Sequence, residues 1–524
     1  MAMTEAALMG VDLGTSSVKV VIIDEDGNML AQASSKYPIS TPAPNWAEQD
    51  PESWWSAVKE AIRAALKILG PRRILAVGFS GQMHGTVILG KDFKPLRPAI
   101  IWADSRSERQ CREIYELVGR KRVLEIACNH VMPGFMAPSL LWIRENEPEI
   151  FEKIHQILLP KDYIRFRLTG SIATDYSDAS STLLFNVKDR RWSRELISAI
   201  GLEEEYFPEV RESVEIVGEI SDKAAEETGL KPGILVATGG GDSPVGAVGC
   251  GLIEPGAVSS NIGSAGQVFT TVDEPKVDPR YRINTFCHAS PGKWCIQGSI
   301  LSAGLALSWF IEGLGFKELL KDGDAYEVLL REAESIKPGS DGLIFLPYLI
   351  GERSPHMDPY ARGVFLGLTL THGRQHIVRS IMEGVTYALR DCLEIFKELG
   401  VKVERIIARG GGSRSRLWRQ IQADIFNAKV STVKVREEAA FGAALLAGVG
   451  AGVYRDLREA VERAVRIEET VDPDPDHVKV YERYYLEIYR KLYPALKDYF
   501  RLIADILQRC HDRKTFNILG TARS

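Results

Sequence analysis

The chain has 524 residues, 45% hydrophobic and 26% charged, which is the composition of a globular protein with about two to four domains. Lys and Arg number 65 against 70 Asp and Glu, so the net charge of −5 leaves no basic excess for binding nucleic acid. The longest small and apolar run, 442–453, is shorter than the roughly 20 residues of a membrane span. Seven cysteines without a CxxC pair and an N-terminus without a secretory signal lead us to expect a cytoplasmic protein without a disulfide framework.

Short β-rich runs alternate with helical patterns along most of the chain, which indicates an α/β fold. In the first half, Asp50 and Pro51 supply an N-cap and a first-turn proline for a helix. Apolar residues then recur at a spacing of four and predict one buried stripe: Trp54, Val58, Ile62 and Leu66. Strands are predicted at 18–23, 74–79, 99–102, 157–159 and 234–238.

The second half repeats the alternation and ends in a helical pattern. Two segments, 11–20 and 260–269, both read as strand, small-residue turn and strand, which favours a duplicated domain. A terminal helix is predicted over 471–508, with a frayed end from Arg509. Strands are predicted at 257–262, 266–272, 343–346 and 405–408, and helices at 376–392, 413–427 and 437–450.

Neither common nucleotide motif is present. The segment Gly85–Lys91 approaches a P-loop, but Asp92 stands in place of the required hydroxyl, and the intervening Thr-Val-Ile-Leu is a strand pattern. No GxGxxG follows a strand, which disfavours a Rossmann dinucleotide site.

Three glycine turns at strand ends take their place as candidate ligand sites. In 12–17 (DLGTSS) an acid ends a strand before a turn whose N–H groups can bind an anion. In 237–249 three glycines precede Asp242 at a predicted helix start, which is typical of close approach by a ligand. In 408–415 (ARGGGSRS) another strand runs through glycines into a helix, where phosphates or a flat base can lie.

These turns belong to a longer series of segments that resembles the FGGY carbohydrate kinases, a family of the actin-like ATPase superfamily. The resemblance runs from about Val11 to Gly450 and is strongest toward the branch that phosphorylates xylulose; 81–85 is typical of that branch. The matching segments are 46–51 (WAEQDP), 81–85 (GQMHG), 132–135 (MPGF), 158–163 (LLPKDY), 345–348 (FLPY), 351–356 (GERSPH) and the signature from Gly363 through Gly367, His376 and Ser380 to Glu383.

The resemblance implies an α/β protein of two actin-like (ribonuclease H-like) domains with a duplicated sheet-and-helix core and an active-site cleft between them. It implies a sugar-binding domain over 1–255, a nucleotide-binding domain over 256–490, and a terminal helix with a flexible tail over 491–524. ATP, Mg²⁺ and a small-molecule sugar are the implied ligands. A homodimer is an option, since members of the family are often dimers.

The implied reaction is ATP-dependent phosphorylation of a ketopentose, with D-xylulose giving D-xylulose 5-phosphate. Asp242 matches the base that takes the proton of the attacking hydroxyl, in a reaction governed by positioning and charge. Asp12 and Asp242 match the acids that hold Mg²⁺ through water. The implied ATP-binding residues are Thr15, Ser16, Gly263, Ser264, Gly411, Gly412 and Ser413, and those around the sugar are Met83, His84, Trp102, Asp104 and Asp242.

Two departures from the family pattern keep the sugar open. Ser139 stands where the family usually has Lys, and Ala265 removes a hydroxyl near the polyphosphate. D-Ribulose and L-ribulose therefore stay as alternatives. An actin-like ATP-binding module and a sugar sensor are rivals from other classes. The 81–85 segment and Asp242 argue against the module, which needs no ketose pocket, and sugar binding without turnover would identify the sensor.

Overall fold

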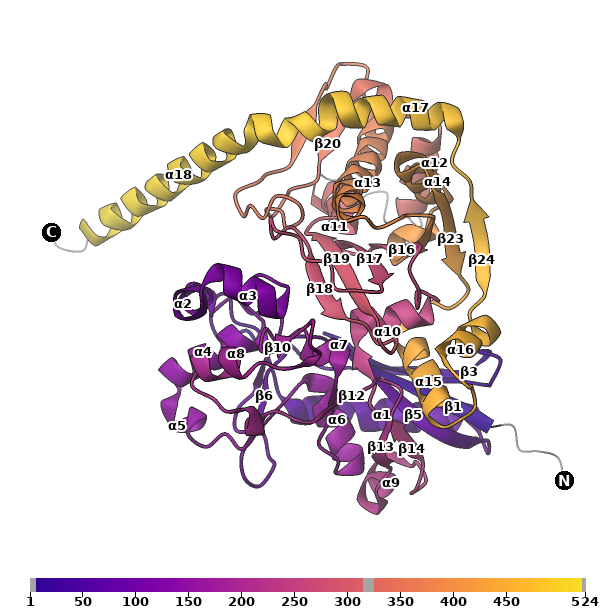
Figure 1. Ribbon diagram of the computed structural model, residues 1–524. Coiled ribbons are helices and arrows are strands. Elements are labelled where there is room, and N and C mark those ends of the chain that lie inside the picture. Colours follow the sequence, from indigo (N-terminus) through magenta and orange to yellow (C-terminus); the bar gives the residue numbers. More distant parts are fainter. Residues whose placement is uncertain (1–5, 314–324, 521–524) are drawn as a thin grey trace. The chain divides into compact units, whose positions relative to one another are not determined.

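The computed structural model describes residues 6–313 and 325–520, which form two compact units (Figure 1). Unit 1 contains the residues up to Pro255 together with Thr270–Ile296 and Val433–Ile467. Unit 2 contains Gly256–Phe269, Gln297–Thr432 and the residues from Glu468 onward. A division of the chain at residue 255 therefore leaves out two later segments that pack into unit 1, and the second of them carries helix α15 (Glu438–Gly450).

Unit 1 is built on a seven-stranded mixed sheet with the order β13-β14-β5-β1-β2-β3, in which β15 also pairs with β5. β1 is antiparallel to β2 and parallel to β5. The strands predicted at 18–23, 74–79 and 234–238 are confirmed as β2, β5 and β14. The strands of this sheet are β1 (Ala6–Leu13), β2 (Ser17–Ile23), β3 (Met29–Lys36), β5 (Arg73–Gly81), β13 (Ile216–Glu219), β14 (Leu235–Ala237) and β15 (Gly240–Gly241).

Short strands complete unit 1. The strands predicted at 99–102 and 157–159 are confirmed as β7 and β8, and the segment that approached a P-loop contains β6. The short strands are β4 (Glu48–Gln49), β6 (Val87–Leu89), β7 (Ala99–Ile100), β8 (Gln156–Leu158), β9 (Thr174–Asp175), β10 (Phe185–Asn186), β11 (Arg191–Trp192), β12 (Val210–Arg211) and β18 (Asn284–Cys287).

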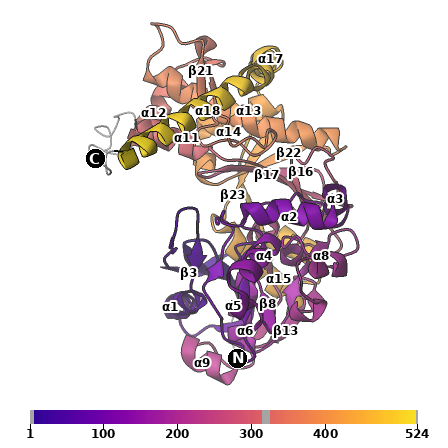
Figure 2. The same ribbon diagram turned by 90° about the vertical axis from the view of Figure 1, so that its left-hand side faces the viewer.

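Helix α1 (Pro51–Leu69) begins and packs as the sequence predicts. Asp50 caps it by accepting a hydrogen bond from the Glu52 backbone N–H at 3.0 Å. The helix packs against β2 and β3, and Figure 2 shows it beside β3. The other helices of unit 1 are α2 (Glu108–Val118), α3 (Arg120–Ala127), α4 (Met136–Asn146), α5 (Pro148–Phe151), α6 (Pro160–Thr169), α7 (Tyr176–Ala179), α8 (Arg194–Ala199), α9 (Asp222–Thr228), α10 (Asp242–Gly249) and α16 (Leu457–Ala464).

Unit 2 contains strands with the neighbour order β19-β17-β16-β22-β23-β24. β16, its turn and β17 repeat the strand-turn-strand plan of β1 and β2, and the second-half strands and helices predicted from the sequence are confirmed. The strands are β16 (Ala257–Ile262), β17 (Gly266–Val272), β19 (Trp294–Ile300), β20 (Ile344–Leu346), β21 (Val364–Leu366), β22 (Arg405–Arg409), β23 (Lys429–Val433) and β24 (Ile467–Val471). The helices are α11 (Gly304–Ser308), α12 (Ala325–Glu334), α13 (Arg374–Glu398), α14 (Arg416–Phe426), α17 (Pro475–Arg483) and α18 (Arg490–Gly520).

The C-terminal helices continue further than predicted. The predicted terminal helix is confirmed, but α18 is helical past Arg509, where a frayed end was expected. Its proline, Pro494, lies near its start, and neither glycine nor proline stands between Arg509 and Gly520. Thr521–Ser524 lie outside the described residues. Tyr485 stacks on Tyr387 of α13 with a centroid separation of 5.8 Å, and the tilted ring of Tyr489 lies 4.9 Å from that of Tyr387. In the described part of the chain no helix combines the length and apolar character needed to cross a membrane.

Helix α15 lies against β1, β5 and α10 at backbone distance. A Cβ on Gly10 of β1 would collide with the carbonyl oxygen of Ala440, and a Cβ on Gly78 of β5 with that of Ala443. Gly249 of α10 approaches another α15 carbonyl in the same way. Glycine is required at these positions because rigid backbone, rather than a movable side chain, fills the space.

We expect Gly10→Ala to lower the free energy of unfolding by about 3 kcal/mol or more, the upper part of the range for overpacked cores. Urea denaturation followed by circular dichroism measures this. Gly373→Ala is the control, because its Cβ would meet only the flexible end of the Gln375 side chain. Equal stability of the two variants would contradict the backbone contact.

Candidate functional site

Three strand ends bring predicted site residues to one edge of the unit 1 sheet. Asp12 on β1 is in register with Ser80 on β5, and Ser80 is in register with Gly240 on β15. These three strands are parallel, so their carboxyl ends meet at the edge where α/β sheets bind ligands. Asp242 begins α10 two residues after Gly240. The predicted metal-binding acid and the predicted base therefore belong to the same edge.

Asp12 is a partly buried acid at the start of the first glycine turn. Its Oδ1 accepts a hydrogen bond from Ser80 Oγ at 2.9 Å. Burial raises the pKa of Asp12, and the Ser80 bond and the nearby Lys19 ammonium oppose that shift. Lys19, opposite Asp12 in the hairpin register, forms an ion pair of 2.5 Å with Glu437. A cation beside Asp12 would favour its ionised form, as binding of Mg²⁺ requires.

The turn after Asp12 is held from several sides. Gly14 N–H donates to Ser17 O at 3.1 Å, and Tyr37 OH donates to the Gly14 carbonyl. Gln49, from the WAEQDP segment, donates through Nε2 to Thr15 O at 2.7 Å. Trp102 Nε1 donates to Thr15 Oγ1 at 2.9 Å, so a residue predicted for the sugar contacts one predicted for ATP. Ser16 is exposed beside them.

The glycines before Asp242 are required by geometry. Gly239 has φ of 76°, and a Cβ there would collide with the Phe79 carbonyl of β5. Gly241 then caps α10 in an extended conformation. Asp242 is half-buried in the first turn of α10, where the helix N-terminus favours a negative charge.

Met83 and His84 lie beside this turn. A Cβ on Gly241 would lie 2.7 Å from Met83 Cγ, so Met83 packs directly on the turn that carries Asp242. His84 has φ of 71°, and its Nδ1 is 2.8 Å from Ser181 O. A carbonyl can only accept, so Nδ1 carries a proton. The structure therefore brings Met83 to the Asp242 turn and fixes the ring of the adjacent His84.

Ser139 acts on this region through Phe135. Its buried Oγ donates to the Phe135 carbonyl at 2.8 Å within α4. The Phe135 ring packs on His84 with a centroid separation of 3.8 Å. The departure from the family pattern at Ser139 thus supports the residue that packs against His84.

Asp104 lies in a buried ion pair. Its carboxylate accepts from Ala47 N–H at 2.7 Å and from Arg106 Nε at 2.9 and 3.0 Å. Arg106 also contacts Glu48 at 2.7 Å and lies 3.7 Å from the centroid of the Trp46 ring. These partners occupy both carboxylate oxygens, so Asp104 supports the wall of the site rather than presenting a carboxylate to a sugar.

A cavity of about 750 Å³ lies in unit 2, within the size range of small-molecule pockets. Gly263, Ser264, Gly411 and Gly412 line it, as expected for a nucleotide site. Ser413 is buried outside the lining, and its Oγ donates to Gly410 O at 2.8 Å and so holds the turn. The lining residues that no sequence motif marked include Leu307, Tyr326 and Leu330.

Ala265 lies outside the lining of this cavity. It is exposed, and its carbonyl accepts from Gly263 N–H at 3.0 Å. The backbone of residue 265 therefore shapes the turn, and its missing hydroxyl removes nothing from the cavity wall.

The acids fit the way proteins hold Mg²⁺. In residues 6–313 and 325–520, no three His, Cys, Asp or Glu side chains converge as a metal cage. Mg²⁺ is usually held by one or two carboxylates with substrate phosphates and water. Asp12 is suited to that role. Burial disfavours its charged form, and a bound cation would favour it.

Sequence reasoning missed a buried charged cluster beside the Asp242 turn. Lys161 and Asp162 belong to the LLPKDY segment and start α6, where charges usually face solvent. Here both side chains are fully buried together with Asp175 and Asp178. No local pattern distinguishes this cluster from a solvated helix face.

We expect Asp104→Asn to lower the free energy of unfolding by about 3 kcal/mol, because it leaves a buried guanidinium with one carboxylate partner fewer. Urea denaturation measures this. A smaller loss in Asp104→Asn/Arg106→Met than in the single variant would confirm the pair. Glu195→Gln, which breaks an exposed pair with Arg122, is the control and should leave stability unchanged. A large rise in sugar KM at unchanged stability would instead make Asp104 a sugar ligand.

Comparison with known proteins covers both units. Residues 7–249 match the N-terminal domain of the FGGY family of carbohydrate kinases, and residues 258–451 match its C-terminal domain. Xylulose kinase of Bacillus subtilis is 36% identical over 493 residues, 94% of this chain and 97% of that protein. Xylulose kinase of Escherichia coli is 37% identical over 489 residues, 93% and 99% of the two chains. The crystal structure of ligand-bound xylulose kinase from Lactobacillus acidophilus has a TM-score of 0.89 and 28% identity, covering 95% of this chain and all of that one.

Proposed function

Since the chain belongs to the FGGY family of carbohydrate kinases, we propose that it transfers the γ-phosphate of ATP to D-xylulose and forms D-xylulose 5-phosphate. The observation that carries the proposal is the half-buried Asp242 on a turn that packs against Met83. Similarity to xylulose kinases over nearly the whole chain supports the choice of sugar.

Asp242 acts as the general base. Its carboxylate takes the proton from the C5 hydroxyl of the sugar as that oxygen attacks the γ-phosphorus. The bond between the γ-phosphorus and the β–γ bridging oxygen breaks, and ADP leaves with the electron pair. Met83, His84 and Trp102 line the sugar, while the Asp104–Arg106 pair keeps the neighbouring wall in place.

The nucleotide belongs to the cavity of unit 2, where the turns at 263–264 and 411–412 present backbone to it. The turn at Thr15 and Ser16 supplies phosphate-binding groups of unit 1. Asp12 and Asp242 would hold Mg²⁺ through water, and the ion would neutralise phosphate charge during the transfer. The chain contributes positioned donors and acids, because phosphoryl transfer needs little covalent help.

Asp242→Asn should lower kcat about 10²- to 10⁴-fold, the contribution of a positioned general base, while ATP still binds. The measurement is ADP release with MgATP and D-xylulose, D-ribulose, L-ribulose, gluconate, glycerol or no sugar, with ATP affinity from calorimetry. Asp222→Asn is the control, because Asp222 also lies in the first turn of a helix but is exposed. Full turnover by Asp242→Asn would remove this residue from its role, and a strong signal with a sugar other than D-xylulose would correct the substrate.

Gly411→Leu should raise the KM for ATP at least about ten-fold and leave the KM for the sugar unchanged. A Cβ there has no neighbour closer than 3.9 Å, so the added side chain enters the cavity without disturbing the turn. Ala265→Leu is the control, because residue 265 is exposed outside the lining. An unchanged KM for ATP in Gly411→Leu would place the nucleotide elsewhere.

A further inference from the structure

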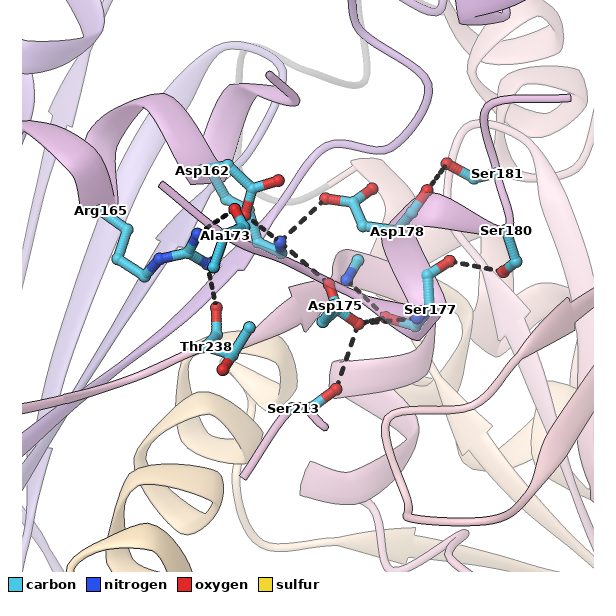
Figure 3. Close-up of polar contacts among 12 residues, drawn as sticks. Asp162, Arg165, Ala173, Asp175, Ser177, Asp178, Ser180, Ser181, Ser213 and Thr238 are labelled. Atoms are coloured by element: carbon cyan, nitrogen blue, oxygen red, sulfur yellow. Dashed lines mark hydrogen bonds and ion pairs between the residues drawn. The ribbon is translucent and has the colours of Figure 1, made fainter. Parts of the chain in front are cut away.

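A charged cluster lies buried inside unit 1, against the turn that carries Asp242 (Figure 3). Lys161 Nζ is 2.6 Å from Asp162 Oδ1, 2.9 Å from Asp175 Oδ1 and 3.3 Å from Asp178 Oδ2. Arg165 pairs with Asp162 at 2.8 Å. None of these five side chains is exposed to solvent.

Two chains of hydrogen bonds lead from this cluster to the Asp242 turn. Asp175 Oδ2 accepts from Ser177 Oγ at 2.5 Å, and Ser177 Oγ accepts from Gly241 N–H at 3.0 Å. On the other side, Arg165 donates to Thr238 O at 2.7 Å. The cluster thus binds the backbone on both sides of the Gly239–Gly240 pair. Figure 3 shows the bond of Arg165 to Thr238 and that of Asp175 to Ser177.

The turn needs such restraint because glycine is the most mobile residue. Three consecutive glycines precede Asp242, and each loses more conformational freedom on ordering than any other residue. Gly240 cannot be replaced to stiffen the turn, since a Cβ there would lie 2.8 Å from Ser177 Oγ. The Ser177 hydroxyl leaves no room for a side chain at Gly240, and it also accepts from the Gly241 N–H. The rigidity of the turn must therefore come from residues outside it.

The charges of the cluster hold Asp175 in place. Burial alone would lower the pKa of Lys161, but Asp162, Asp175 and Asp178 together raise it, so Lys161 stays charged. Burial raises the pKa of Asp178 well above its usual range, and the Lys161 ammonium opposes that shift. Asp175 also accepts from Ser177 N–H at 2.7 Å and from Ser213 Oγ at 3.1 Å. Its position is therefore fixed from four directions.

We propose that Lys161, Asp175 and Ser177 form a relay of positioning residues that fixes the Gly239–Asp242 turn and thereby orients the Asp242 carboxylate. This proposal rests on the function proposed above for Asp242. All three side chains are buried, and the hydrogen bond from Gly241 N–H to Ser177 Oγ links them to the turn.

Ser177→Ala tests the relay, with Ser213→Ala as its matched control. Both serines are buried and donate to the same Asp175 oxygen, but only Ser177 accepts from Gly241. Hydrogen exchange of the Gly241 amide, read by fragmentation mass spectrometry, should be about ten-fold faster in Ser177→Ala and unchanged in Ser213→Ala. This readout needs no activity. Equal exchange in the two variants would overturn the relay.

Steady-state kinetics with MgATP and D-xylulose give the second readout. Ser177→Ala should lower kcat about 10- to 100-fold with both KM values unchanged, because a misplaced base slows transfer without weakening binding. Ser213→Ala should retain kcat within about two-fold. A loss of kcat that is equal in both variants, or a loss confined to KM, would overturn the relay while leaving the proposed kinase activity intact. Wild-type protein without sugar-dependent turnover would refute the proposed function, and the catalytic role of the relay with it.

Asp175→Asn tests whether the charged cluster acts through the relay. Combined with Ser177→Ala, it should lower kcat no further than the larger single loss, because both changes break one path. Losses that multiply in the double variant would exclude Asp175 from the relay. Circular dichroism of each variant confirms folding, and if Asp175→Asn fails to fold, the two serine variants decide.

Discussion

The register of β1, β5 and β15 is the constraint on which the rest of unit 1 depends. It places Asp12, Ser80 and Gly240 in one row across three parallel strands. A slip of one residue would turn every side chain to the opposite face, and Val11 would take the place of Asp12. The glycines Gly10 and Gly78 lie on the same strands and admit α15 at backbone distance, so the packing that stabilises the sheet also fixes the row.

Much of this arrangement could be predicted from the sequence because its signals are local. Strand-to-glycine turns at 12–17, 237–242 and 408–412 predict backbone that binds a ligand, and an acid beside a turn predicts where charge is needed. Asp50 and Pro51 set the start of α1 through contacts within four residues. Such signals can be recognised in a single sequence because the residues that act together are neighbours in the chain.

The remaining features depend on contacts between distant residues. The family resemblance predicts Asp104 beside the sugar, and only the fold shows that Arg106 and Ala47 donate to its carboxylate. The charged residues of α6 likewise have the pattern of a solvent-exposed helix face. Only the fold shows that they are buried against Asp175 of β9. The return of 433–467 to unit 1 has no local signal at all, since it follows from the fit between α15 and glycines more than 350 residues earlier.

In the proposed function, the two units hold their ligands by different means, and this affects which residues can vary. The predicted nucleotide turns of unit 2 present backbone at Gly263, Gly411 and Gly412, so substitution at an outward position such as Ala265 leaves the cavity wall intact. The sugar side of unit 1 depends on side chains whose orientation is set by others, as Phe135 and Ser181 set that of His84. Specificity for the sugar can therefore change through supporting residues such as Ser139, while the turn that carries Asp242 and its buried restraints stay the same.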